Sequence, residues 1–167
     1  MPKIRTLTQL QEALDADMGW RIKEISTFKL AAKADRANQK VFVRAGVALV
    51  YAHWEGFVKS SSEAYLNFVD NQGHAYRDLK SCFSIFGLKG KLALLVESRQ
   101  SKSNIKAFDF VLNELDKPAR MNMSSAIDTE SNLTSKVFAN IATSLDIATA
   151  SYETKRAYPV DADTHQG

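Results

Sequence analysis

The sequence is poor in the residues that interrupt helices or cross-link a chain. Its 167 residues include 3 Pro, 7 Gly and a single cysteine, Cys82. Few positions therefore force the backbone out of a helix. One cysteine cannot form a disulfide within the chain, which favours a reducing compartment. The N-terminus has no apolar segment of the secretory type, and no apolar run approaches the length of a membrane span. We therefore expect a cytoplasmic protein without membrane contact.

Charge and composition are those of an ordinary globular domain. Hydrophobic residues make up 45% and charged residues 25% of the chain, and the length favours one domain with a substantial core. The 22 basic and 19 acidic residues leave a formal net charge of +3. This mild excess permits RNA as a partner but does not argue for it, because nucleic-acid binding needs a clustered basic face.

Apolar residues recur at helical spacing along most of the chain and predict an all-α bundle of about five helices. We expect helices over residues 8–35, 39–69, 76–86 with a second piece at 91–99, 104–117 and 132–145. Gly87 and Gly90 separate the two pieces of the third, whereas the first continues through Gly19. The 39–69 helix is apolar on almost every side of its middle, which predicts the most buried helix. We expect a domain over residues 1–150 and a loose tail over residues 151–167.

The motifs that usually carry chemistry are missing. There is no glycine-rich phosphate loop and no GxSxG elbow, and one cysteine with three scattered histidines does not make a zinc site. We therefore expect no metal and no cofactor. What remains is a polar stripe on the 39–69 helix, where a rotation of about 100° per residue aligns Arg44, Tyr51, Glu55 and Ser62, with Lys59 at its edge. The stripe is either a solvated or ion-paired structural face or one wall of a cleft that binds an anion or RNA.

His53 faces the opposite side of the same helix. It follows Arg44 by nine residues, a net rotation of about 180°, so a straight helix cannot bring the two to one site. Trp54 and Phe57 are close to His53 and lie away from the polar stripe. We predict that these three residues are buried in the core or in a homodimer interface, the alternative for His53 being a catalytic role.

Two further groups of charged residues have both a structural and a functional interpretation. Arg21 and Glu24 are i,i+3 neighbours in the first helix and form either a surface ion pair or a support for Arg44 or Glu55 across the helix pair. A modest basic cluster, which is either a solvated face or an RNA track, contains Lys89, Lys91, Arg99 and Lys102.

Three stretches together resemble a known family: WRIKE at residues 20–24, RAGVALVYAHWEGFVK at 44–59 and TESNL at 129–133. Their order and spacing are similar to those of the MAE-like HEPN subgroup of the HEPN superfamily, and the resemblance covers residues 7–145. It implies a helical bundle that often dimerises. It also implies a metal-independent endoribonuclease of toxin–antitoxin, phage-defence or RNA-processing systems, with RNA as substrate and an antitoxin or another protein as partner.

The resemblance implies site residues as well. In the family an arginine, usually within Arg-Asn-x-x-x-His on the last helix, steadies the scissile phosphate, and the histidine assists proton transfer at the RNA 2′-hydroxyl. No histidine of this chain follows an arginine at that spacing. In the relatives the TESNL helix is followed by a further helix with the motif, where this chain has a polar tail. The supporting catalytic roles implied here are those of Arg44 and Glu55, and the candidate RNA-binding residues are Arg21, Tyr51 and Lys59.

Two functions therefore stay open. The first is an RNA-cleaving HEPN enzyme or an incomplete form of one, whether a natural short form, a truncated product or a domain whose catalytic helix comes from elsewhere. The second is a non-catalytic helical module that dimerises or binds a partner protein. We expect the chain by itself to cleave RNA weakly or not at all.

Overall fold

The structure is a computed structural model that describes residues 2–121, 127, 129 and 132–149. Over these residues it contains five α-helices, one short 3-10 helix and no strand, so the predicted all-α bundle is confirmed. Residues 151–167, predicted as a tail, lie outside the described residues. The helices in chain order are α1 (Leu7–Ala34), α2 (Gln39–Asp70), η1 (Tyr76–Asp78), α3 (Ser81–Glu97), α4 (Ser101–Glu114) and α5 (Ser135–Ser144).

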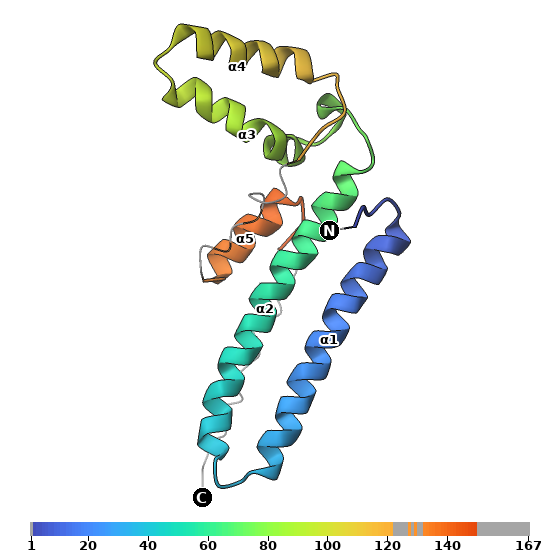
Figure 1. Ribbon diagram of the computed structural model, residues 1–167, viewed down its shortest axis with the longest axis vertical. Coiled ribbons are helices and arrows are strands. Elements are labelled where there is room, and N and C mark those ends of the chain that lie inside the picture. Colours follow the sequence, from blue (N-terminus) through green and yellow to red (C-terminus); the bar gives the residue numbers. More distant parts are fainter. Residues whose placement is uncertain (1, 122–126, 128, 130–131, 150–167) are drawn as a thin grey trace, which may run out of the picture.

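α1 and α2 form a long antiparallel hairpin (Figure 1). α1 begins with a capping box, in which the Thr6 hydroxyl accepts from the Gln9 backbone N–H at 3.1 Å and the Gln9 side chain accepts from the Thr6 N–H at 3.3 Å. The helix runs through Gly19, as predicted. The hairpin turns at residues 35–38, where the Asp35 carboxylate accepts from the backbone and side chain of Asn38.

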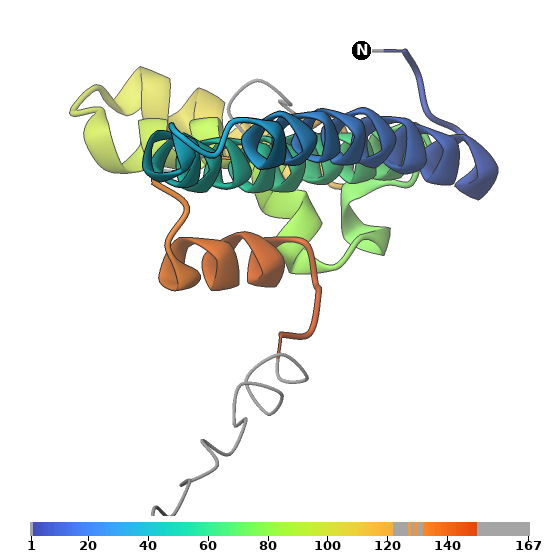
Figure 2. The ribbon, with the colours of Figure 1, turned by 90° about the horizontal axis from the view of Figure 1, so that it is seen from below.

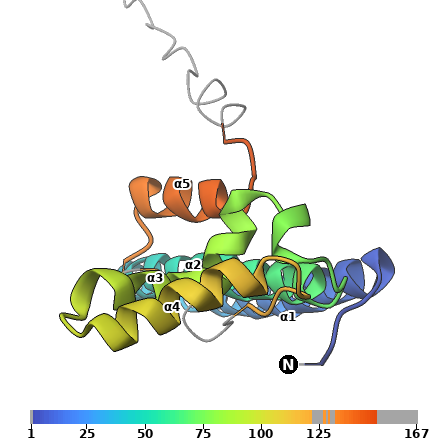
Figure 3. The same ribbon diagram turned by 90° about the horizontal axis from the view of Figure 1, so that it is seen from above.

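The main hydrophobic core lies along the C-terminal half of α2, where α5 and the start of α3 pack against it. Leu66 of α2 is completely buried, and burying such a side chain contributes roughly 2 kcal/mol. Figures 2 and 3 show α5 to one side of the layer formed by α1 and α2. α5 begins at Ser135 after a Thr134 cap that accepts from the Val137 N–H, three residues later than the predicted start at residue 132. The buried residues of this core are Val58, Leu66, Phe83, Met121, Ile127, Leu133, Val137, Ile141 and Leu145.

α3 and α4 form a second hairpin across the end of the first (Figure 1). The prediction that α3 breaks at Gly87 and Gly90 is wrong, because α3 is continuous. Gly87 is instead a contact point. A Cβ at Gly87 would lie 2.2 Å from the Tyr76 hydroxyl and 2.6 Å from the Arg120 carbonyl oxygen. That hydroxyl bonds both the N–H and the carbonyl of Arg120. Packing against Tyr76 thus offsets the conformational cost of glycine within a helix.

The N-terminal half of α2 is not buried, contrary to the prediction for this helix. Val43 is 61%, Val47 69% and Val50 51% exposed, because α5 and the main core cover only the other half. By length and composition α2 is the one helix of the described residues that could cross a membrane, with a mean hydropathy of 1.2 over its most apolar 18 residues. The mean hydropathy of α2 is thus nearer to that of a membrane-spanning helix than we expected from the sequence. A single such helix is weak support for one, and Arg44, Glu55 and others interrupt the apolar run.

Replacing Gly87 tests the contact that sets the α3–α4 hairpin. We expect Gly87→Ala to lower the free energy of unfolding by about 2–3 kcal/mol, because the methyl group displaces the Tyr76 hydroxyl and the Arg120 backbone. Gly90→Ala is the matched control. No atom lies within 4 Å of a Cβ there, so this change should stabilise α3 by about 0.5–1 kcal/mol. Urea unfolding followed by circular dichroism measures both, and equal stability of the two variants would contradict this packing.

Candidate functional site

The three stretches of the family resemblance meet around the middle of α2. The 20–24 stretch of α1 contacts α2 at His53 and Gly56. The 129–133 stretch contacts α2 from a different side, at Tyr51 and Glu55. One and a half turns of a single helix therefore hold both outer stretches in place, and the candidate site is the polar surface around them.

Two side-chain hydrogen bonds join α2 to the 129–133 stretch. The Thr129 hydroxyl donates to Oε1 of Glu55 at 2.7 Å, and the Tyr51 hydroxyl donates to Oδ1 of Asn132. These bonds engage two members of the predicted stripe. A third member, Ser62, is buried and donates to the Val58 carbonyl at 2.6 Å. The polar stripe is therefore buried at its C-terminal end, at Ser62, and exposed at its N-terminal end, at Arg44.

A buried guanidinium group fixes α1 to α2 on the other side. Arg21 is only 8% exposed. Its Nε and Nη2 donate to the two carboxylate oxygens of Asp17 at 2.9 and 3.1 Å, and its Nη1 donates to the His53 carbonyl at 3.2 Å. The Trp20 ring stacks on the guanidinium, with Cζ of Arg21 4.5 Å from the ring centroid. Charge-assisted, two-pronged contacts of this kind are among the strongest polar interactions in proteins.

Asp17 also accepts hydrogen bonds from the Ser60 hydroxyl at 2.6 Å and from the Trp20 indole N–H at 3.0 Å. Burial by itself would raise the pKa of the Asp17 carboxyl. The hydrogen bonds from Arg21, Ser60 and Trp20, together with the Arg21 charge, outweigh burial and hold this pKa below its usual value of 3.8. Asp17 therefore stays ionised, as the counter-ion of Arg21, to a lower pH than an ordinary aspartate.

Gly56 makes room for Arg21. A Cβ at position 56 would lie 2.6 Å from Nη1 and 3.1 Å from Nη2 of Arg21, and the hydrogen bonds to Asp17 and His53 leave the guanidinium little freedom to move. Of the two interpretations of Arg21 and Glu24, the ion pair between them is not formed, since Asp17 is the partner of Arg21 and Glu24 lies beside His53. The i,i+4 spacing of Asp17 and Arg21 was present in the sequence. No local sequence pattern could have indicated the roles of Gly56 and Ser60, because these residues contact α1 only through the way in which the two helices cross.

The histidines occupy three different situations. His53 is 7% exposed, its ring meets the edge of Trp20 at 5.3 Å, and its Nε2 lies 3.4 Å from the Glu24 carboxylate. Within the described part of the chain, that Nε2 forms no hydrogen bond. His74 is exposed, and its carbonyl accepts from the Ala119 N–H at 2.8 Å, which brings the backbone before Arg120 beside it. His165 lies outside the described residues.

The other predicted site residues lie on or near the surface of α2. Lys59 is exposed and Phe57 is half-buried. Trp54 is 44% exposed, with its ring 5.3 Å from that of Phe138 at the start of α5. Arg44 is exposed, and His53 faces α1, so the structure does not bring these two together. Arg21, a candidate for RNA binding, is buried, and its guanidinium is engaged within the protein.

A concentration of positive charge that the sequence analysis did not single out lies at the turn of the α1–α2 hairpin. Residues 29–44 contain five basic side chains and one acidic side chain, Asp35, giving 5 − 1 = +4, whereas the whole chain carries +3. Lys29 and Lys33 are i,i+4 neighbours on α1, and Lys40 and Arg44 are i,i+4 neighbours on α2, while Arg36 lies in the turn. All five are exposed: Lys29, Lys33, Arg36, Lys40 and Arg44. We call these residues the basic tip.

A comparison with protein families finds a match over residues 16–164 to the family described as RiboL-PSP-HEPN. The chain belongs to this HEPN family. The match covers most of the chain and includes all three stretches, so the expected HEPN assignment is confirmed, while the MAE-like subgroup stays a prediction. No curated protein and no solved structure matches the chain significantly.

Asp17→Asn tests the buried ion pair of the HEPN chain. We expect a loss of about 1–3 kcal/mol of unfolding free energy at neutral pH, because the variant leaves the Arg21 charge buried without its counter-ion. Because folding lowers the pKa of Asp17, its ionised form stabilises the fold above the unfolded value of 3.8, and this contribution disappears as the pH falls through the folded value. The difference between wild type and Asp17→Asn should therefore shrink below about pH 4.

The control is Asp15→Asn on the same helix, where the exposed carboxylate accepts only from the Gln11 side chain. This change should alter stability by no more than about 0.5 kcal/mol at any pH. Urea unfolding at a series of pH values measures all three proteins. An Asp17→Asn penalty that is the same at pH 3 and pH 7 would contradict the assignment of Asp17 as an ionised partner of Arg21.

Proposed function

We propose that this HEPN protein targets RNA and that its RNA contacts lie on the basic tip and the adjoining polar face of α2. The observation that carries the proposal is the basic tip itself, where four exposed cations of α1 and α2 and a fifth in the turn between them, Arg36, gather. Phosphate backbones are bound by such clustered charge and not by net charge as a whole. Arg44 belongs to the tip, and Tyr51 and Lys59 continue the same face of α2, which makes all three candidate RNA contacts.

Family membership supports a nuclease-type role, but the described residues favour binding over cleavage. Attack by a 2′-hydroxyl needs a proton acceptor within hydrogen-bond reach and a cation fixed on the phosphate. His53 is enclosed by Trp20 and α1, and Glu55 is already engaged by Thr129. We therefore propose that the chain is a cytoplasmic HEPN endoribonuclease in reduced or incomplete form. A toxin–antitoxin or phage-defence setting, with an antitoxin as partner, is part of this proposal and rests on the family resemblance.

RNA binding is tested by reversing charge at the tip. In Lys40→Glu/Arg44→Glu we expect the affinity for a fluorescent single-stranded RNA to fall roughly tenfold or more at low salt, because two phosphate contacts become repulsive. Lys89→Glu/Lys102→Glu is the matched control, with the same change of net charge in the other basic cluster. Fluorescence anisotropy over a range of salt concentrations measures both. Equal losses in the two variants would show that only net charge matters and would contradict a site at the tip.

Cleavage is tested separately, in the presence of a chelator. We expect the chain to cleave RNA weakly or not at all, because His53 is shielded from solvent. Robust cleavage that is lost in His53→Ala would overturn this argument. Cleavage lost only in Arg44→Ala or Glu55→Ala would place the reaction on the polar face of α2. Loss in His74→Ala alone would place it at the junction with Arg120.

A second candidate function is favoured by the exposed apolar half of α2. A soluble monomer rarely exposes a continuous apolar strip of this kind, and such strips mark interaction surfaces. The chain would then act as a helical module that dimerises or binds a partner protein. The two functions involve adjoining surfaces, since Lys40 and Arg44 lie beside the apolar strip on the same segment of α2.

A further inference from the structure

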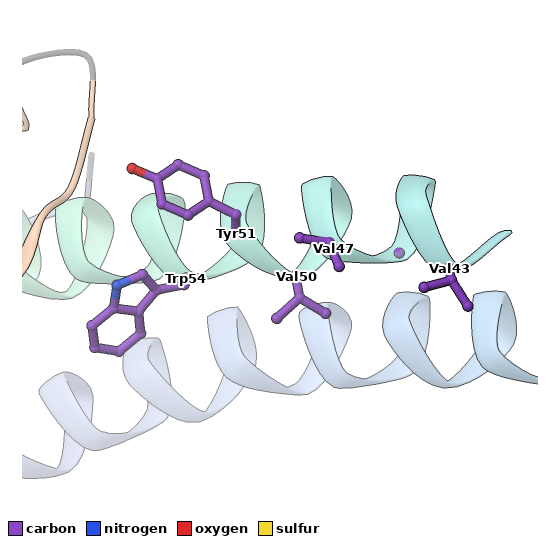
Figure 4. Close-up of a pocket in the computed structure, with 6 residues that line it drawn as sticks. Val43, Val47, Val50, Tyr51 and Trp54 are labelled. Atoms are coloured by element: carbon purple, nitrogen blue, oxygen red, sulfur yellow. The ribbon is translucent and has the colours of Figure 1, made fainter. Parts of the chain in front are cut away.

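A cavity lies between α1 and α2 directly beside the basic tip. Its volume is about 320 Å³, and it is lined by side chains of residues 25–33 of α1 and 39–50 of α2. Two of its lining residues, Val43 and Val50, also belong to the exposed apolar strip of α2, which consists of Val43, Val47, Val50 and Trp54. Figure 4 shows Val43 and Val50 on the side of α2 next to α1. The cavity is therefore where the apolar strip meets the crevice between the two helices.

Two aromatic rings, one from each helix, border the cavity. The ring centroids of Phe28 and Phe42 are 5.6 Å apart, and the rings meet at an angle of 65°. Both residues are half-buried, so part of each ring is still open to a ligand. Gly46 lets Phe28 lie close to α2, because a Cβ at that position would be 3.1 Å from Cε1 of Phe28. Aromatic rings that are held in place and partly open in this way are suited to stack on a flat group.

The charge around the cavity is of one sign. Lys29 and Lys33, two cations of the basic tip, line it, and within the described part of the chain no acidic side chain does. Gln39 adds an amide that can both donate and accept hydrogen bonds. Lys40 and Arg44 lie on the other flank of the apolar strip, so cations border this surface on both sides. A ligand that matches the cavity has a flat apolar face, a hydrogen-bonding edge and negative charge on either side.

A nucleotide of single-stranded RNA has all three properties. Its base has a flat face that stacks on aromatic rings, its base edge carries donors and acceptors, and the phosphates before and after it are negatively charged. Ligand pockets usually have volumes of roughly 300–1,000 Å³, and a cavity at the lower end of this range favours one base over several. In a duplex the base is stacked and paired, so only an unpaired base can enter. A fatty-acid anion also joins an apolar body to a charge, but it has neither the flat face nor the polar edge.

We propose that the cavity between α1 and α2 holds one unpaired base of RNA while the neighbouring phosphates lie on the basic tip. The inference rests on the proposed binding of RNA at the tip and deepens it. Phosphate contacts alone do not distinguish one form of RNA from another. A base in the cavity gives the tip a preference for single-stranded RNA over a duplex.

Filling the cavity tests the base site. Ala32 is half-buried and lines the cavity, so Ala32→Leu adds three carbon atoms there without a change of charge. The wild type should bind single-stranded RNA about tenfold more tightly than abasic RNA of the same length, which keeps the phosphates and lacks the bases. Ala32→Leu should remove most of this difference and leave the affinity for abasic RNA unchanged. Fluorescence anisotropy at low salt measures all four affinities.

Ala31→Leu is the matched control, because Ala31 is the exposed neighbour and does not line the cavity. It should behave like the wild type, and circular dichroism checks that both variants are folded. Equal affinities of the wild type for the two RNAs, or equal behaviour of Ala32→Leu and Ala31→Leu, would overturn the base site. The charge-reversed chain Lys40→Glu/Arg44→Glu would then still show whether RNA binds at the tip. No binding of either RNA by the wild type would overturn both proposals.

The same variants distinguish the other occupant. Decanoate, a fatty-acid anion, should bind the wild type no more tightly than it binds Ala32→Leu. Decanoate binding that is lost in Ala32→Leu, together with equal affinities of the wild type for the two RNAs, would assign the cavity to an acyl anion and overturn the base site.

Discussion

α2 is longer than the helices that pack beside it in the described part of the chain, and most features of this molecule depend on that mismatch. Its 32 residues span about 48 Å, whereas the 10 residues of α5 span about 15 Å. The main core therefore forms only beside the C-terminal half of α2, where α5 and the start of α3 pack. α1 follows α2 along most of its length but covers only one side of it (Figure 1). The other side of the N-terminal half keeps its valines in solvent.

Because the uncovered half has no core of its own, polar and aromatic contacts must hold α1 and α2 in register there. The Arg21 cluster lies at the boundary between the two halves and performs this role. A buried charge is costly unless it is fully paired. Arg21 meets that condition through Asp17, the His53 carbonyl and the Trp20 ring, and the absence of a side chain at Gly56 makes the close approach feasible. Beyond it, Phe28 packs edge-on against Phe42 and touches the position of Gly46.

The sequence predicted the elements better than their environment. Helical periodicity is a local property, so the helices and the passage of α1 through Gly19 followed from spacing. The burial of α2 could not be predicted this way, because an all-round apolar helix has the same pattern whether its cover is the same chain or another. Gly87 was mistaken for a break for a related reason, since its function is a contact with Tyr76, eleven residues away, and with Arg120.

In the candidate site too, relations within one helix could be predicted from the sequence, whereas contacts between elements could not. The helical angles correctly separated Arg44 from His53, a geometric relation within one helix. They could not show that Glu55 is engaged by Thr129, 74 residues away in the sequence, or that Asp17 and not Glu24 is the partner of Arg21. Those contacts depend on which helix faces the residue, and that choice is made by the tertiary packing.

The basic tip and the apolar strip share one segment of α2, and this constrains how the proposed functions can coexist. Like charges that are brought together oppose association, and the opposition weakens over a distance of about 10 Å at moderate salt. The strip from Val43 to Trp54 spans 11 residue steps, or about 16 Å. A helix that covers the whole strip therefore lies within the range of the tip's charge at its Val43 end and beyond that range at its Trp54 end. RNA bound at the tip, as proposed, would neutralise this charge, so the constraint on a positively charged partner is greatest in the free protein.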